Sequence, residues 1–179
     1  MVGKLKERAE KIKQGNPLDP ATTMGAMFDV NHAKKVEEFL NVGKAEAKLI
    51  TGGDRFAIND SDAFIQPTIF ADVSEDATIA RDEIFGPVLA IQTFDTEDEA
   101  IKMANKSIYG LAASVWTSDL ARAMDLSDKL HVGTVSVNTV DALSAMTPFG
   151  GMKQSGFGRD LSIHSFDKYT ALKTIWVKY

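Results

Sequence analysis

The segment Arg81–Val88, with the sequence RDEIFGPV, holds the side chains best suited to chemistry. A carboxylate of the acidic pair Asp82-Glu83 can accept hydrogen bonds from two sugar hydroxyls, and the ring of Phe85 can pack on a flat ring. The pair Gly86-Pro87 fixes a sharp backbone bend just before an apolar run. A turn with solvated acids explains the same residues, and the segment by itself leaves both interpretations open.

Other motifs point away from a complete catalytic site. Gly156–Leu161 begins like a dinucleotide fingerprint, but it lacks the third glycine and does not directly follow a predicted strand, so a structural turn is expected. The three histidines are far apart in sequence, and the chain has no cysteine. Disulfides, thiolate metal ligands and thiol nucleophiles are therefore excluded, a metal site is not expected, and local signals alone do not assemble a nucleophile, a base and an orienting residue.

The composition is that of a globular protein with an acidic surface. Of 179 residues, 44% are hydrophobic, and 25 acidic against 20 basic side chains give a net charge of −5. This charge disfavours nucleic acid as a partner, because binding to phosphates depends on Lys and Arg. The charged amino terminus, without a following apolar stretch, resembles neither a signal peptide nor a membrane anchor, so we expect a cytoplasmic protein with no membrane contact.

The first half of the chain is predicted to contain two helices and two extended segments. The helices cover about residues 5–12 and 30–44, a strand covers 48–51, and extended chain covers 64–73. Asp29 or Asn31 can cap the second helix. Pro67 confines the extended segment to a sheet edge or an irregular stretch, because proline donates no ladder hydrogen bond.

From Val88 onward, strands and helices alternate. Strands are predicted over 89–94, 113–117 and 133–138, with helices between them that begin after the capping box Thr96–Glu99 and after Ser118. The helix that begins after Ser118 is expected to bury Leu120, Ala123, Met124 and Leu130. This alternation predicts an α/β fold with a mostly parallel sheet flanked by helices.

Two segments near the end of the chain have separate functional interest. The glycine-rich stretch 139–160 leaves the carboxyl end of a predicted parallel strand, where such folds bind ligands. The apolar residues 170–179 are predicted to form a strand that must be paired, with another subunit if nothing in its own chain is adjacent.

Three motifs in the same order carry a resemblance to a known family. Glu83–Val88 (EIFGPV), Asn105–Ala112 (NKSIYGLA) and Pro148–Gly156 (PFGGMKQSG) resemble the carboxyl-terminal part of the NAD(P)-dependent aldehyde dehydrogenase superfamily. The resemblance extends over essentially the whole chain. The sequence Gly158-Arg159-Asp160 and the ending KTIW look most like the branch that oxidises aminoaldehydes.

The resemblance implies roles for several side chains. Glu83 would bind the hydroxyls of the nicotinamide ribose, and Phe85 would position the nicotinamide ring. The substrate contacts would come from the loop after the third strand, namely Asp141, Leu143 and Phe149. Asp141 could attract a cationic aminoaldehyde, although an exposed loop acid without a role fits equally well.

Three further residues carry weaker expectations. Asn138 is expected to order the loop backbone rather than to contact substrate. His32 and Lys35 match the start of the family's ribose-contacting helix, but we expect a solvated helix face for both.

The departure from the family is large, because the family's catalytic cysteine, glutamate base and Rossmann-type domain have no counterpart here. The resemblance begins just past that cysteine. It therefore implies a fragment, with residues 1–160 as part of the catalytic domain and 161–179 as a terminal helix and strand for oligomerisation. NAD or NADP would bind the complete enzyme, with weak or no binding by this chain alone.

Two other functions stay open at this stage. The chain could be a non-catalytic module that forms a homo-oligomer or pairs with a partner chain through 170–179. It could also bind a small molecule on its own through the loop 139–160.

Overall fold

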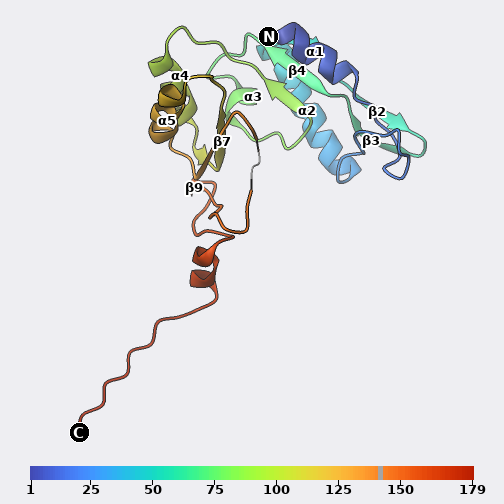
Figure 1. The fold of residues 1–179 in the computed structure, drawn as a ribbon. Coiled ribbons are helices and arrows are strands. Elements are labelled where there is room, and N and C mark those ends of the chain that lie inside the picture. Colours follow the sequence, from blue (N-terminus) through green and yellow to red (C-terminus); the bar gives the residue numbers. More distant parts are fainter. Residues whose placement is uncertain (141–142) are drawn as a thin grey trace. The chain divides into compact units, whose positions relative to one another are not determined.

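A computed structural model describes residues 1–140 and 143–179 of the chain, which divide into the units Met1–Phe94 and Asp95–Tyr179 (Figure 1). The helices and strands of the first unit are α1 (Val2–Glu10), α2 (Val30–Glu46), β1 (Lys48–Thr51), β2 (Arg55–Ile58), β3 (Ser61–Ile65), β4 (Thr68–Ala71), α3 (Thr78–Arg81) and β5 (Val88–Ala90). Those of the second are α4 (Glu97–Lys106), β6 (Tyr109–Gly110), β7 (Ala112–Val115), α5 (Leu120–Lys129), β8 (Thr134–Val137), β9 (Met152–Lys153) and the 3₁₀-helix η1 (Ile163–Lys168). The predicted α/β class is confirmed, whereas the predicted division at residue 160 stays a prediction.

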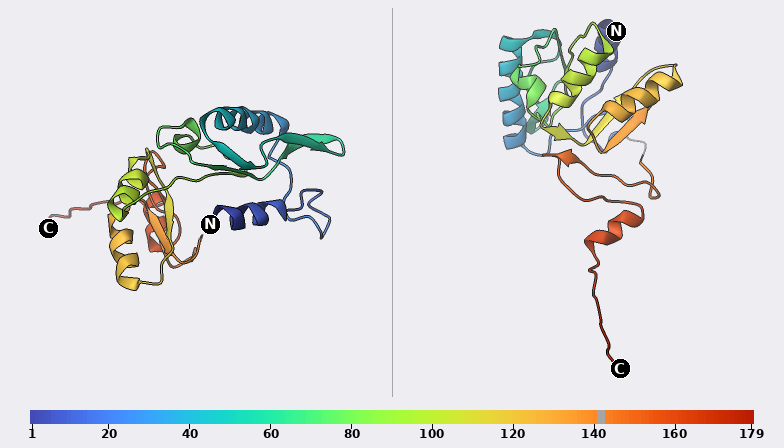
Figure 2. Two further views of the ribbon diagram at one scale, coloured as in Figure 1. Left: turned by 90° about the horizontal axis from the view of Figure 1, so that it is seen from above. Right: turned by 90° about the vertical axis from the view of Figure 1, so that its left-hand side faces the viewer.

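The first unit is built on a sheet with the strand order β1-β4-β5. Strand β4 runs antiparallel to β1 and parallel to β5, with Phe70 opposite Ala90. Helices α1 and α2 lie on opposite faces of these strands (Figure 2). Strands β2 and β3 form a separate antiparallel hairpin that α2 also contacts.

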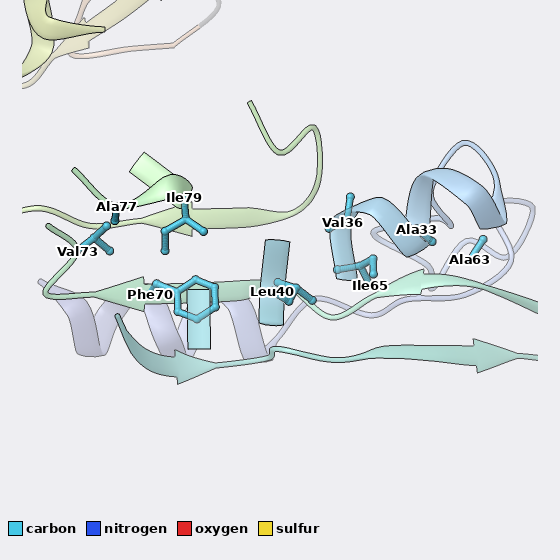
Figure 3. Close-up of a cluster of buried hydrophobic side chains, with 9 residues drawn as sticks. All are labelled: Ala33, Val36, Leu40, Ala63, Ile65, Phe70, Val73, Ala77 and Ile79. Atoms are coloured by element: carbon cyan, nitrogen blue, oxygen red, sulfur yellow. The ribbon is translucent and has the colours of Figure 1, made fainter. Parts of the chain in front are cut away.

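The core of the first unit lies between α2, α3 and the strands (Figure 3). Its largest fully buried apolar side chains are Phe70, Leu40, Ile65 and Val36. Gly43 of α2 lies against the ring of Phe70, where an added Cβ would come within 2.7 Å of the ring. The close approach of helix and sheet therefore depends on glycine at this position.

Two strand predictions in this unit need correction. The extended segment 64–73 is broken at Pro67 into β3 and β4, and β4 is the central strand of its sheet, not an edge. Proline is tolerated because it precedes β4, whose first amide, Thr68 N, donates to Pro87 O at 2.8 Å. The predicted strand 89–94 is only the short β5, Val88–Ala90.

In the second unit, β7 and β8 form a parallel pair, as the alternation predicted. The capping box is confirmed at Thr96, whose side chain accepts from Glu99 N at 3.2 Å. Helix α5 begins one residue later than expected, because Asp119 is its cap and accepts from Arg122 N. This placement buries Ala123 but leaves Leu120 and Met124 exposed, contrary to the prediction.

The last part of the chain is held by short pairings. Strands β6 and β9 form an antiparallel pair. Residues 170–179 form no strand, and all are exposed (Figure 1), so their predicted pairing with another chain stays a prediction. Within the described residues, no helix has the length and apolarity needed to span a membrane. The same residues contain no cluster of three or more His, Cys, Asp or Glu side chains suited to a metal.

Candidate functional site

The turn between α3 and β5 presents Glu83 and Phe85 on the surface of the first unit. Phe85 has a φ of +53°, and its side chain is 71% exposed. A left-handed conformation at a bulky residue costs of the order of 1–3 kcal/mol and persists only where the surroundings impose it. Glu83 is also exposed, and its carboxylate has no hydrogen bond or ion pair within the part of the chain that the structure describes. Both side chains are available to a ligand.

Helix α2 contacts the middle of this turn, at Phe85 and Gly86. The imidazole of His32 lies 2.7 Å, from Nε2 to carbonyl oxygen, from Phe85. Because a carbonyl oxygen only accepts, Nε2 must carry the proton and donate. One turn further along α2, Val36 packs on Gly86, where an added Cβ would lie 2.7 Å from Cγ1.

The same helix also anchors the segment that leads into the turn. At the end of α2, the carboxylate of Glu46 accepts from Thr78 N at 2.7 Å and from Thr78 Oγ1 at 2.8 Å. This hydrogen-bond pair fixes the start of α3, which runs directly into the turn. Helix α2 therefore supports the turn that exposes Glu83 and Phe85.

The expectation for His32 was wrong, because its ring contacts the Phe85 turn instead of lying on a solvated helix face. Lys35 is exposed, as predicted. The one sequence signal for the contact is the place of His32 three residues after the cap Asp29, which accepts from His32 N at 2.6 Å. Nothing in the sequence signals the left-handed backbone at Phe85.

The second unit contains a hollow of about 360 Å³ beside β7 and β8. It brings together Leu143 and Phe149, two of the predicted substrate contacts. The third, Asp141, lies outside the described residues. The other lining residues are the small or polar Ala112, Ala113, Ser114, Thr134 and Ser136 and the apolar Val140. Thr134 Oγ1 is buried there without a hydrogen-bond partner in the described chain.

Asn138 orders the start of the loop, as predicted. Its backbone is left-handed, with a φ of +55°. Its side-chain amide accepts from Thr117 N at 2.9 Å and donates to Thr117 O at 2.8 Å. At the other end of the loop, backbone hydrogen bonds in both directions join Phe149 to Asp160. Asn138 therefore ties the start of the loop to Thr117, and Phe149 and Asp160 join two parts of the loop to each other.

Two of the three sequence motifs interlock in this unit. The ammonium group of Lys153 donates to Asn105 O at 3.0 Å and to Ser107 O at 2.9 Å, closing the end of α4. The hydroxyl of Ser155 accepts from Gly110 N at 3.0 Å. These motif residues hold the chain that carries Phe149.

The segment Gly156–Leu161 is a structural turn, as expected. Phe157 is 99% exposed, and the guanidinium of Arg159 donates to the carbonyl oxygens of Gly151 and Gly158. An added Cβ at Gly150 would lie 2.5 Å from Gly158 O, so the backbones cross closely here. No α-helix begins in or directly after this segment, and the element that follows it is the six-residue 3₁₀-helix η1.

Shifted pKa values belong to structural ion pairs. The Arg55 guanidinium donates hydrogen bonds to Glu37 and to Asp62, and these bonds, that to Glu37 first, raise the pKa of Arg55 and join α2 to the β2–β3 hairpin. A hydrogen bond to Asp125 raises the pKa of Lys129 within α5. Neither group lies at the turn or the hollow, so neither acts as an acid or base there.

Comparison with known proteins gives one consistent result. The model of the aldehyde dehydrogenase family matches residues 1–175. NADP/NAD-dependent aldehyde dehydrogenase PuuC from Escherichia coli is 47% identical over 97% of this chain and 34% of its own length. Betaine aldehyde dehydrogenase from Sinorhizobium fredii is 47% identical over 98% of this chain and 37% of its own length.

Solved structures agree with the sequence matches. The indole-3-acetaldehyde dehydrogenase AldA of P. syringae superimposes with a TM-score of 0.93 at 44% identity, covering 99% of this chain and 36% of that one. The aldehyde dehydrogenase KauB from Pseudomonas aeruginosa gives the same TM-score, identity and coverage. The chain thus spans about a third of the length of the curated relatives it matches, 34–37% of each.

Proposed function

Because the chain belongs to the aldehyde dehydrogenase family, we propose that it supplies the carboxyl-terminal part of a site that oxidises an aldehyde to a carboxylic acid with NAD or NADP. The observation that carries the proposal is the Phe85 turn. The exposed carboxylate of Glu83 and the exposed ring of Phe85 lie two residues apart there. The backbone at Phe85 is left-handed and accepts a hydrogen bond from His32 of α2.

The side chains at this turn suit the nicotinamide half of the cofactor. Among the residues that the structure describes, the Glu83 carboxylate has no hydrogen bond or ion pair, so it can accept two hydroxyl hydrogen bonds from the ribose. Phe85 offers a ring face for packing and for excluding water from the nicotinamide. The bound nicotinamide would take up hydride from the aldehyde carbon. The role of this chain is to bind and orient that ring.

The hollow beside β7 and β8 suits the organic part of an aldehyde. Leu143 and Phe149 supply apolar surface, and the small side chains of Ala112 and Ala113 leave room for the substrate. We propose aminoaldehydes as the substrate class, with Asp141 as the group that attracts a cationic substrate. The names of the relatives cover several aldehydes at 44–47% identity, so overall similarity does not choose among them.

The chain on its own is proposed to be inactive. With no cysteine in its sequence, it has no thiolate to attack the aldehyde carbon. Weak or no binding of NAD(P) is expected, because Glu83 and Phe85 address one half of the dinucleotide only. The nucleophile and the rest of the cofactor site would come from a part of the enzyme outside this sequence.

A second candidate function is an interaction module, favoured by one observation. The segment 170–179 is exposed throughout and carries several large apolar side chains, with Trp176 at 93% and Leu172 at 107% exposure. A run of this kind without strand pairing in its own chain can be paired by another copy or by a partner chain. Sedimentation of the full chain, compared with a chain ending at residue 169, tests this candidate.

Complementation tests the main proposal. The chain is mixed with the cysteine-bearing amino-terminal portion of PuuC, and formation of reduced cofactor is followed with a short aminoaldehyde. We expect activity only in the mixture. Glu83→Gln should lower it by raising KM for the cofactor, because an amide accepts ribose hydroxyls less strongly than a carboxylate.

The control for Glu83→Gln is Glu38→Gln, an exposed carboxylate of α2. Oxidation by the chain alone would overturn the proposed inactivity. A complemented enzyme that Glu83→Gln affects no more than Glu38→Gln would remove Glu83 from the cofactor site.

A further inference from the structure

We infer that His32 is a positioning residue: its imidazole holds the backbone carbonyl of Phe85 and thereby fixes the direction in which the Phe85 ring is presented. That this contact matters for cofactor binding rests on the proposed function, whereas the contact between His32 and Phe85 is observed independently of it. His32 does not need to contact cofactor for this role.

The contact is placed where the turn is otherwise least supported. Asp82 N bonds back to Thr78 O at 3.0 Å on one side, and Pro87 O accepts from Thr68 N at 2.8 Å on the other. Within the described residues, the backbone of Phe85 has its one hydrogen bond from His32. The residue with the left-handed φ is therefore the one that the imidazole holds.

The histidine is itself fixed before it reaches the turn. Asp29 caps α2 and binds the backbone amide of His32 at 2.6 Å, in the third position of the helix. The Asp29 carboxylate thus accepts from the His32 backbone N–H, and the His32 ring donates to the Phe85 carbonyl. Because the cap fixes the backbone of His32 at the helix start, the imidazole reaches the carbonyl from a defined position.

The position requires a donor at a defined distance from the helix. Leucine has a similar size but no N–H group, so it would leave the Phe85 carbonyl without its partner. Glutamine retains an amide N–H donor and can take the place of the imidazole. A role in space filling and a role in donation are therefore separable by these two substitutions.

The test uses the full chain, with isotope labelling, and no cofactor. Substitutions His32→Leu and His32→Gln are compared with His131→Leu, because His131 belongs to the other unit of the chain. The measured quantities are the carbonyl ¹³C shift of Phe85, its φ-dependent backbone coupling and the thermal midpoint. We expect His32→Leu to move the first two clearly beyond the His131→Leu control and His32→Gln to restore them in large part.

Equal Phe85 signals in His32→Leu and in the control would overturn the inference, as would failure of His32→Gln to restore them. If His32→Leu does not fold, the ¹⁵N shifts of the wild-type imidazole decide: a neutral ring with its proton on Nδ1 excludes donation to Phe85. Because no cofactor is used, failure of complementation would leave these results unchanged. The positioning role and the proposed function can therefore fail separately.

Discussion

The contact between Gly86 and Val36 allows the strictest test of how α2 holds the Phe85 turn. In Gly86→Ala, the new methyl group would lie 2.7 Å and 3.0 Å from the two Cγ atoms of Val36. Val36 is fully buried, and its β-branched side chain is nearly fixed in a helix, so it has little freedom to move aside. The turn must therefore shift away from α2.

The size of the effect follows from the two contacts. Overpacking of this kind costs about 1–3 kcal/mol. Val36→Ala removes two methyl groups, worth about 1.6 kcal/mol at about 0.8 kcal/mol each, plus a cavity term. In the double variant the new methyl group faces the Cβ atom that alanine retains at position 36, at 3.5 Å, which is an ordinary van der Waals contact. The double variant should therefore be no less stable than Val36→Ala alone. This outcome corresponds to a coupling free energy of about 1–3 kcal/mol between the two substitutions.

The assay must report on the first unit. Both tryptophans and all three tyrosines lie in Asp95–Tyr179, so aromatic fluorescence does not follow the unit that carries the substitution. Urea unfolding is therefore measured by native-state hydrogen exchange of the α2 amides. Gly25→Ala is the matched control, because an added Cβ there meets nothing within 4 Å. It should be neutral, or stabilising by up to about 1 kcal/mol.

Two results would refute the reasoning. Gly86→Ala as stable as Gly25→Ala would show that the turn does not pack on α2 as described. A double variant whose loss equals the sum of the two single losses would show that Gly86 and Val36 are not in contact.

Four further outcomes are expected in the second unit. Thr96→Ala removes the cap of α4 and should lower its protection from hydrogen exchange by about 1 kcal/mol, with α5 unchanged. Lys153→Met removes two donors to carbonyl oxygens and should speed amide exchange at the end of α4. The bond to Asp125 raises the pKa of Lys129, so its stabilisation is present at neutral pH and lost as pH rises through that pKa. Thermal midpoints of Lys129→Met and wild type should therefore converge in alkali. Removal of 170–179 should leave the circular dichroism of the remaining chain unchanged, because these residues form no helix or strand.

The sequence predicted the elements where local signals and burial agree. Helix α2 begins after Asp29 because the cap carboxylate and the apolar spacing point to the same residue. The prediction failed at Leu120 and Met124 because periodicity alone does not say which apolar stripe is covered, and the stripe through Ala123 is the buried one. Strand β4 was misplaced because Pro67 was interpreted without knowledge that the strand begins after it.

The sequence proposed the residues of the candidate site but not what supports them. Glu83 and Phe85 were assigned from the family resemblance, whereas the residue types before the Gly86-Pro87 bend left a ligand site and a solvated turn equally open. The imidazole of His32 comes from a position 53 residues away, and no pattern in the sequence links it to Phe85. Contacts between distant segments depend on how α2 packs on the sheet, which local propensity does not encode.

The contacts that hold the Phe85 turn and the loop carrying Phe149 bear on the cause of inactivity in this chain. The Phe85 turn is held by α2, β4 and α3, all within Met1–Phe94. The loop that carries Phe149 is held by Asn138 and Lys153 through contacts within Asp95–Tyr179. Each of these contacts is made between residues of the same unit. An inactive chain would therefore be missing a nucleophile and cofactor contacts rather than a folded site, and complementation is expected to restore activity without refolding either unit.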